Sequence, residues 1–191
     1  MMKVGVLALQ GDVREHERAL EAAGATPMLV RYPDQVADVD AMVVPGGEST
    51  TIGKLLQRFG LLDPLAERAR SGMPLYGTCA GAILMARTIT GDQDAPLRLD
   101  LMDIVVRRNA YGRQVDSFES DLQIEGVDEP FRAVFIRAPS IEEVGPGVEI
   151  LAHHREAPVL VRQGNLLAST FHPEMTGDNR VHELFVEMLK G

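Results

Sequence analysis

The chain has 191 residues, of which 45% are hydrophobic and 25% charged, and its formal net charge is −9 at neutral pH. These values are typical of a globular protein, and the length fits a single domain over residues 1–191. The acidic balance gives no electrostatic support for binding nucleic acid. There is no apolar run of about eighteen residues, no secretion signal and only one cysteine, so we expect a cytoplasmic protein without a membrane span.

The first half of the chain alternates strand and helix patterns, which indicates an α/β fold. Apolar runs typical of buried parallel strands occupy residues 3–9, 26–31, 40–44 and 73–77. The patterns between and after them predict helices over residues 13–23, 50–59, 63–71 and 80–88. Ser49 or Thr50 is expected to cap the second helix, and Pro64 suits the first position of the third.

The second half is richer in short strand patterns. These lie at residues 102–107, 122–124, 131–136, 148–153, 158–162 and 165–171, and a final helix is expected over 178–190. Gly164 and Asn165 are typical of a tight hairpin turn between the last two strands. We therefore expect a parallel α/β first half joined to a partly antiparallel second half within one domain.

The sequence Gly-Thr-Cys-Ala-Gly at 77–81 joins a predicted strand to a predicted helix. One sharply turned residue between strand and helix, with a glycine two places to either side, is typical of a nucleophile elbow. The turned residue is Cys79. A lone buried cysteine is more often structural than catalytic, so the elbow alone does not establish a function.

Two further motifs favour catalysis by Cys79. His172 and Glu174, in Thr-Phe-His-Pro-Glu at 170–174, follow a predicted strand and could serve as a base and its orienting carboxylate. The Pro-Gly-Gly turn at 45–47 also follows a predicted parallel strand, so it should reach the same edge of the sheet.

Backbone N–H groups near the elbow could stabilise an oxyanion. Gly47, in the glycine turn, and Ala80, directly after Cys79, are the predicted donors. A phosphate-binding loop does not fit this turn. Five residues separate Gly47 from Gly53, whereas that motif has four, and a leucine follows Lys54 where a serine or threonine is required.

These motifs, in this order, resemble the class I (triad) glutamine amidotransferase family over essentially the whole chain. The resemblance implies a three-layer α/β fold, with a mixed, mainly parallel sheet flanked by helices. Four blocks are similar, more narrowly, to the glutaminase subunit of pyridoxal 5'-phosphate synthase. They are Gly-Val-Leu-Ala-Leu-Gln-Gly at 5–11, Pro-Gly-Gly-Glu-Ser-Thr-Thr at 45–51, the segment 108–119 that begins Arg-Asn-Ala-Tyr-Gly-Arg-Gln, and Phe-Ile-Arg-Ala-Pro at 135–139.

The resemblance implies hydrolysis of L-glutamine to glutamate and ammonia by Cys79, His172 and Glu174, with no cofactor and no metal. Its implied substrate contacts are Gly47, Glu48, Ser49, Arg108, Ile136 and Arg137. A guanidinium is expected to bind the α-carboxylate of glutamine. The sequence leaves open whether this group belongs to Arg108 or to Arg137.

The resemblance also implies a partner. Ammonia would pass to a separate synthase subunit, a (β/α)8 barrel that this chain is too short to contain. In the family, twelve glutaminase subunits surround a core of twelve synthase subunits, and the isolated glutaminase is nearly inactive. We expect docking through residues 10–18. The Gly46–Gly47 peptide is a candidate switch for the oxyanion hole, because glycine changes backbone conformation at little cost.

The remaining histidines are assigned ordinary roles. His153 and His154 are neighbours on a predicted strand and should point to opposite faces, so no metal site is expected there. His16 and His182 are taken as ordinary helix residues. Two alternatives stay open. One is a catalytically silent subunit, although the intact triad argues against it. The other is a different cysteine hydrolase with an elbow, which would not require the blocks at 45–51 and 108–119.

Overall fold

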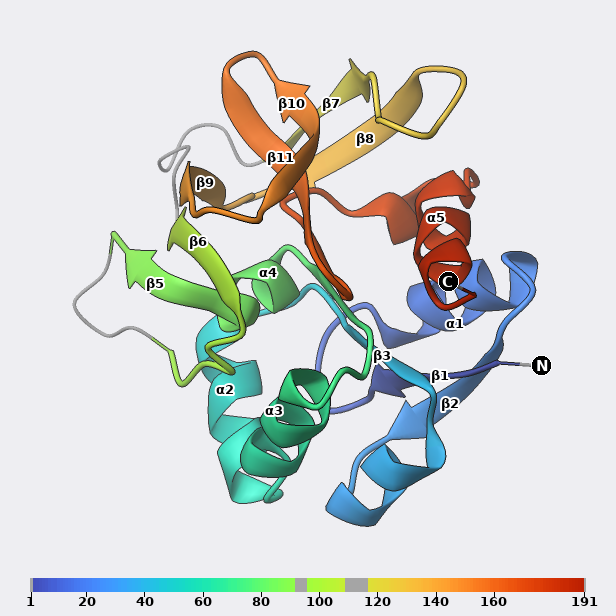
Figure 1. Cartoon of the computed structure of the whole chain (residues 1–191), viewed down its shortest axis with the longest axis vertical. Coiled ribbons are helices and arrows are strands. Elements are labelled where there is room, and N and C mark those ends of the chain that lie inside the picture. The colour runs from blue at the N-terminus through green and yellow to red at the C-terminus, as the bar shows by residue number, and fades with distance from the viewer. Residues whose placement is uncertain (1, 92–95, 109–116, 191) are drawn as a thin grey trace.

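The structure is a computed structural model that describes residues 2–91, 96–108 and 117–190 (Figure 1). Its helices are α1 (Val13–Ala22), α2 (Ser49–Arg58), α3 (Leu62–Arg70), α4 (Ala80–Met85) and α5 (Arg180–Met188), with 3-10 turns η1 (Pro33–Asp38) and η2 (Pro173–Met175). Its strands are β1 (Lys3–Leu7), β2 (Thr26–Val30), β3 (Ala41–Val44), β4 (Leu75–Thr78), β5 (Ala86–Thr90), β6 (Met102–Arg107), β7 (Ser117–Leu122), β8 (Phe131–Ile136), β9 (Ser140–Val144), β10 (Glu149–His154), β11 (Ala157–Gln163) and β12 (Leu166–Ser169). No helix in these ranges is long and apolar enough to cross a membrane.

A seven-stranded sheet in the order β10-β11-β12-β4-β3-β1-β2 forms the centre of the molecule. Neighbouring strands from β12 to β2 run parallel, whereas β11 pairs antiparallel with β10 and with β12. Gly164 and Asn165 join β11 to β12, so the predicted hairpin is confirmed. The predicted mixed, mainly parallel sheet is confirmed with it.

Helices cover both faces of this sheet. Successive side chains of a strand point to opposite faces, so each central strand contributes to two cores. Val43 packs in one core with Leu20 of α1 and Phe185 of α5, whereas Val44 packs in the other with Ile52 of α2. Figure 1 shows α1 beside α5 on one side, and α2, α3 and α4 on the other. The expected three layers are therefore present.

The helix that follows Cys79 is shorter than predicted. It ends at Met85, and residues 86–90 form β5, which pairs with β6. The threonines and isoleucine at 88–90 are β-branched and favour a strand over a helix. Together with β9, these strands form a small second sheet.

Two other strands were missed or misplaced. The strand β9 was not predicted, because Ser-Ile-Glu-Glu-Val carries two carboxylates and little alternation. The strand expected at residues 122–124 lies instead at Ser117–Leu122, paired with β8. Its Glu119 and Asp121 face solvent, and both pair with Arg132 across the ribbon. Such cross-strand pairs depend on a partner that the local sequence does not reveal.

The starts of α2 and α3 also differ from expectation. Neither Ser49 nor Thr50 caps α2; the carboxylate of Glu48 does, by accepting the N–H groups of Thr50 at 3.0 Å and Thr51 at 2.7 Å. A negative charge is favourable at a helix N-terminus. Pro64 is the third residue of α3 rather than the first. It still lies in the first turn, where no N–H is needed.

Candidate active site

Cys79, His172 and the glycine turn come from loops that leave the central sheet at one edge. The strands β1, β3, β4 and β12 are parallel and adjacent in space, so the loops after their carboxyl ends lie close together. Cys79 follows β4, the glycine turn at 45–47 follows β3, and His172 lies beyond β12. The loop after β1 contributes Asp12, which sequence reasoning did not single out.

Cys79 occupies a strained turn between β4 and α4. Its φ of 49° and ψ of −102° are unfavourable for a residue other than glycine, at a cost of roughly 1–3 kcal/mol. A Cβ on Gly81 would collide with the carbonyl oxygen of Val44, and one on Gly77 would lie 2.6 Å from the carbonyl carbon of Gly81. Both glycines are therefore needed for strand and helix to approach. The N–H of Cys79 donates to the carbonyl of Ser169 at 2.8 Å and ties the elbow to β12.

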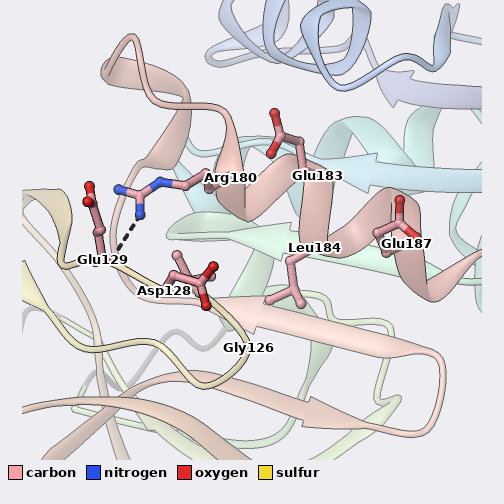
Figure 2. A pocket seen from close by; sticks show the side chains of 8 residues that line it. Gly126, Asp128, Glu129, Arg180, Glu183, Leu184 and Glu187 are labelled. Atoms are coloured by element: carbon pink, nitrogen blue, oxygen red, sulfur yellow. Dashed lines mark hydrogen bonds between the residues drawn. The ribbon is translucent and has the colours of Figure 1, made fainter.

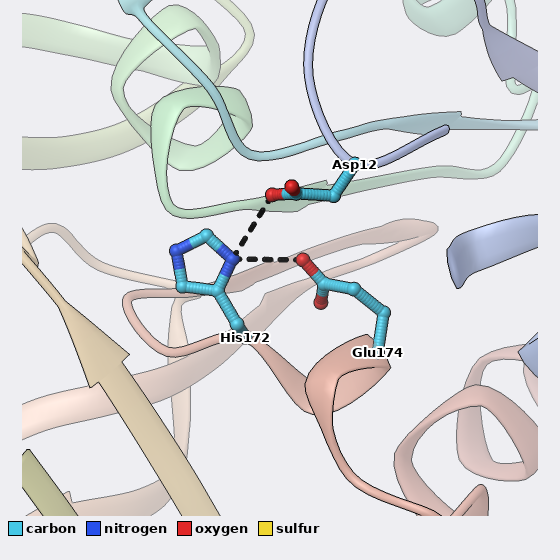
Figure 3. A group of neighbouring side chains, drawn as sticks. All are labelled: Asp12, His172 and Glu174. Atoms are coloured by element: carbon cyan, nitrogen blue, oxygen red, sulfur yellow. Dashed lines mark hydrogen bonds and ion pairs between the residues drawn. The ribbon is translucent and has the colours of Figure 1, made fainter. Parts of the chain in front are cut away.

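His172 lies between two carboxylates, which face the same ring nitrogen (Figure 3). Its Nδ1 is 2.8 Å from Oε1 of Glu174 and 3.3 Å from Oδ2 of Asp12. The other ring nitrogen, Nε2, is thus left for Cys79. Glu174 and His172 are buried, with 6% and 4% of their surfaces exposed, so water does not compete for these hydrogen bonds.

The environment of His172 favours its charged form. Burial alone would lower the pKa of His172, but hydrogen bonds with Asp12, Cys79 and Glu174 and the charge at Cys79 outweigh it and raise the pKa to about 12. Burial also raises the pKa of Glu174, against the opposing effect of the hydrogen bond from His172. At neutral pH the proton on Nδ1 of His172 is therefore retained in the hydrogen bond to Glu174. An imidazolium of this kind stabilises a neighbouring thiolate.

Asp12, His172 and Glu174 could also be considered as metal ligands, since one ligand atom from each lies within 4.8 Å of the others. The 2.8 Å separation between His172 and Glu174 is that of a hydrogen bond, and it uses Nδ1, the atom nearest both carboxylates. We therefore interpret the cluster as a hydrogen-bonded one. The absence of a metal requirement stays a prediction.

His16 and His182 lie on helices α1 and α5, as expected, but they form a buried polar contact that was not predicted. Both are completely buried, and Nδ1 of His16 lies 2.9 Å from Nε2 of His182. Nε2 of His16 lies 3.1 Å from the hydroxyl of Thr78 and 3.5 Å from Oε1 of Glu174. His16 thus connects the triad carboxylate to the end of β4. The position of His16 on the apolar face of its helix was the signal that could have revealed this burial.

The two buried histidines are neutral. Burial, with the nearby His182 and His172, lowers the pKa of His16 well below its usual value. Burial alone lowers the pKa of His182 to about 4. A neutral His16 beside Glu174 does not compete with His172 for the charge of that carboxylate.

We expect replacement of His182 by glutamine to make the protein less sensitive to acid. A folded-state pKa of about 4, below the usual 6.5, means that the unfolded state binds a proton that the folded state excludes. The contribution of His182 to the free energy of unfolding is therefore complete above pH 6.5, and it is lost as the pH falls toward 4. A difference of 6.5 − 4 = 2.5 units corresponds to about 3 kcal/mol.

Urea unfolding at pH 7.5 and pH 4.5 measures this effect. The free energy of unfolding should fall less between these pH values for His182→Gln than for the wild type. His153→Gln, which removes an exposed histidine, is the matched control and should behave as the wild type does. An equal fall for all three proteins would contradict the prediction.

The triad opens into a pocket of about 380 Å³. Its walls include all the predicted substrate contacts: Gly47, Glu48, Ser49, Arg108, Ile136 and Arg137. Asp12, Ile83 and Met175 also line the pocket and were not predicted. Ala80 is not among the lining residues. As the first residue of α4, its N–H has no acceptor within the helix, so it can serve a ligand.

Two arginines line the pocket from different elements. Nη2 of Arg108 lies 3.6 Å from Oε1 of Glu48 and 3.2 Å from the hydroxyl of Thr50, so it is held against the start of α2. Arg137 follows β8 with a φ of 42°, a second strained backbone at the site. The carbonyl oxygen of the preceding Ile136 lies 3.9 Å from the sulfur of Cys79. Residues 109–116 of the block at 108–119 lie outside the described residues.

The glycine turn at 45–47 is fastened to the loop after β1. The N–H of Asp12 donates to the carbonyl of Gly46 at 3.2 Å, and the side-chain oxygen of Gln10 accepts the N–H of Glu48 at 2.9 Å. Gly47 has a φ of 152°, and a Cβ there would lie 2.5 Å from the same oxygen of Gln10. Movement of the first loop would therefore be transmitted to the proposed oxyanion donor.

A larger hollow, of about 600 Å³, lies between α5 and the loop before β8 (Figure 2). It is lined by Gly126, Val127, Asp128, Glu129, Arg180, Glu183, Leu184 and Glu187. Arg180 is engaged by Asp178 and by the backbone carbonyl of Glu129. This hollow has no cysteine, serine, threonine or histidine among its described lining residues, so it is a poor alternative to the pocket at Cys79 for acyl transfer.

A cysteine elbow, a histidine held by carboxylates and a glycine turn at one edge of a three-layer α/β sheet are the features of a triad-type cysteine hydrolase, and the triad glutamine amidotransferases belong to this class. Comparison with known proteins agrees. The family model described as SNO glutamine amidotransferase family matches residues 6–191, and the chain belongs to this family. The predicted class of enzyme is thereby confirmed.

Individual relatives agree over nearly their whole length. A protein named pyridoxal 5'-phosphate synthase subunit PdxT from Frankia casuarinae is 58% identical, covering 98% of this chain and 95% of the relative. A solved structure titled as a glutamine amidotransferase has a TM-score of 0.92 at 51% identity, covering 98% of this chain and 99% of that one. The PurLQS structure from Thermotoga maritima, at 17% identity and a TM-score of 0.73 over 99% of this chain and 100% of that chain, shares the fold. The predicted resemblance to glutaminase subunits of pyridoxal 5'-phosphate synthase is confirmed.

Proposed function

We propose that this chain hydrolyses L-glutamine to glutamate and ammonia, with Cys79 as nucleophile. The observation that carries the proposal is the arrangement of three groups at one pocket. The sole cysteine occupies a strained elbow, the Nδ1 of His172 is held by Glu174, and the glycine turn lies alongside. Nucleophile, base and orienting carboxylate in this relation are sufficient for acyl transfer.

In the first half of the reaction, the Cys79 thiolate attacks the carbon of the substrate carboxamide. The carbonyl oxygen becomes an oxyanion, which we place on the N–H groups of Gly47 and Ala80. A donor of this kind is typically worth about 3–4 kcal/mol in the transition state. The His172 imidazolium then gives its Nε2 proton to the amide nitrogen. The carbon–nitrogen bond breaks and ammonia departs. The glutamyl group remains bound to the sulfur as a thioester.

In the second half, water hydrolyses the thioester. The oxygen of the water attacks the carbonyl carbon while neutral His172 takes a proton from that water. The carbon–sulfur bond then breaks, releasing glutamate and restoring the thiolate beside an imidazolium. Glu174 keeps Nδ1 protonated throughout, so that Nε2 alone accepts and donates.

The pocket suits a zwitterionic amino acid. Arg108 and Arg137 both reach it, and either guanidinium can bind the α-carboxylate through two parallel hydrogen bonds. Glu48 and Ser49 lie on the same wall at the start of α2, and Ile136 lies near the sulfur. These residues, with Gly47, are the proposed substrate contacts. No cofactor or metal enters this mechanism.

We further propose that the ammonia serves a separate synthase subunit. Relatives of this chain are named as subunits of pyridoxal 5'-phosphate synthase. Assembly of twelve glutaminase subunits on twelve barrel subunits, docked through residues 10–18, is the arrangement that the resemblance supports. The contacts between the first loop and the glycine turn give docking a route to the oxyanion hole. The whole of residues 1–191 would act as one glutaminase domain in the reducing cytoplasm, where its thiol persists.

An ammonia-release assay with glutamine, with and without the purified synthase subunit, tests the proposal. We expect release that increases when the synthase is added. A glutamine-like electrophile should label Cys79, and glutamine should protect it. Absence of ammonia in both conditions would contradict the proposal and favour a catalytically silent subunit. Activity of the chain alone equal to that of the mixture would contradict the switch at Gly46–Gly47.

A further inference from the structure

Asp12 lies where an aspartate ordinarily caps a helix, directly before α1. At this position the carboxylate usually accepts a backbone N–H from the first turn. Here the side chain makes no such hydrogen bond. The carboxylate instead faces the imidazole of His172 (Figure 3), and its Oδ2 lies 3.3 Å from Nδ1. Helix capping therefore does not account for this aspartate.

Asp12 also contacts the glycine turn. Its N–H donates to the carbonyl of Gly46 at 3.2 Å. A Cβ on Gly46 would lie 3.0 Å from Oδ2 of Asp12 and 2.5 Å from Cε1 of His172. Asp12, Gly46 and the imidazole are thus packed against one another. One residue joins the catalytic base to the turn that carries the proposed oxyanion donor.

We propose that Asp12 is a positioning residue that shares the Nδ1 proton of His172 with Glu174 and holds the imidazolium against the glycine turn. This inference rests on the proposed function. Asp12 acts through His172, not on the substrate. One quarter of the Asp12 side chain is exposed, whereas Glu174 is buried.

The groups around His172 come from four elements. Asp12 faces it from the loop before α1, Cys79 from the elbow before α4, Glu174 from η2, and neutral His16 from α1 behind Glu174. Among the charged groups of the described residues, the carboxylates of Asp12 and Glu174 are those that approach Nδ1. Loss of the Asp12 charge should therefore destabilise the imidazolium and leave its orientation to Glu174.

Two substitutions test the role of Asp12 in the full chain mixed with the synthase subunit. Asp12→Asn keeps the shape and removes the charge, and Asp12→Ser retains an oxygen suited to helix capping. Removing a facing charge should lower the pH at which His172 loses its proton by roughly 1–3 units. That midpoint is measured on the chain by NMR titration of the His172 ring. In glutamine hydrolysis, kcat should fall roughly tenfold, with KM changed less than about twofold.

The matched control is Glu21→Gln, which removes one exposed carboxylate from the same helix. It should leave both the titration and kcat unchanged. The inference is overturned if both Asp12 variants keep the wild-type midpoint of His172. It is also overturned if their losses appear in KM rather than kcat. Absence of ammonia release by the wild-type mixture would instead refute the proposed function. Failure of the proposed function can therefore be distinguished from failure of the role assigned to Asp12.

Discussion

Replacement of Cys79 by alanine is expected to lower kcat for glutamine hydrolysis by at least about a hundredfold. Among the lining residues that the structure describes, one other carries a hydroxyl or thiol that could attack, namely Ser49 on α2. Ser49 lacks the strained backbone of Cys79 and belongs to a helix whose cap is Glu48. Interaction with Cys79 also raises the pKa of His172, as expected for a nucleophile beside its base.

Ser49→Ala is the matched control for this substitution, because it removes a nucleophilic atom from the same pocket. Its kcat should fall far less than that of Cys79→Ala. Both variants are measured by ammonia release in the presence of the synthase subunit, with circular dichroism to confirm folding. A loss of less than about a hundredfold for Cys79→Ala would argue against nucleophilic catalysis by this residue.

Gly46→Ala is expected to cause a comparable loss through His172. An added Cβ would lie 2.5 Å from Cε1 and 2.9 Å from Nδ1 of the imidazole, distances that carbon atoms do not tolerate. The backbone of Gly46 is not in the left-handed region, so alanine itself is not strained there. The imidazole must therefore shift away from Glu174 and Cys79. Misplacement of a catalytic group by about 1 Å can cost roughly a hundredfold in rate.

Gly177→Ala provides the control, since a Cβ there would meet nothing within 4 Å and Gly177 lies just after the triad carboxylate. It should leave kcat unchanged. For Gly46→Ala, ammonia release should fall while the free energy of unfolding changes by less than about 2 kcal/mol. Wild-type activity in Gly46→Ala would show that the imidazole tolerates displacement and would weaken the assignment of His172 as base.

The parallel part of the sheet could be predicted because each of its strands is a dense apolar run. Buried parallel strands need such runs, and glycines or capping residues separate them from the helices. The strands β5, β7 and β9 were missed or misplaced because they are short and carry polar or charged residues. Their stability comes from cross-strand partners distant in sequence, such as Arg132 for Glu119.

The residue that caps α2 could not be predicted from the local sequence either. Ser49 and Thr50 are common caps, yet the longer side chain of Glu48 reaches back over the first turn and takes their place. A carboxylate in that position also pairs with Arg108 across the pocket. The competition between neighbouring cap candidates is decided by such distant contacts.

The sequence by itself determined the elbow at Cys79, the histidine and carboxylate at 172 and 174, and the glycine turn, because each is a local motif with its own steric requirement. The tertiary structure alone decided that Asp12 turns toward His172 and that His16 and His182 form a buried pair behind Glu174. These contacts join residues up to 166 positions apart. The side chain of a helix-capping aspartate or of a helical histidine has several ordinary partners, and only the packing of β1, β12, α1 and α5 at one edge of the sheet selects among them.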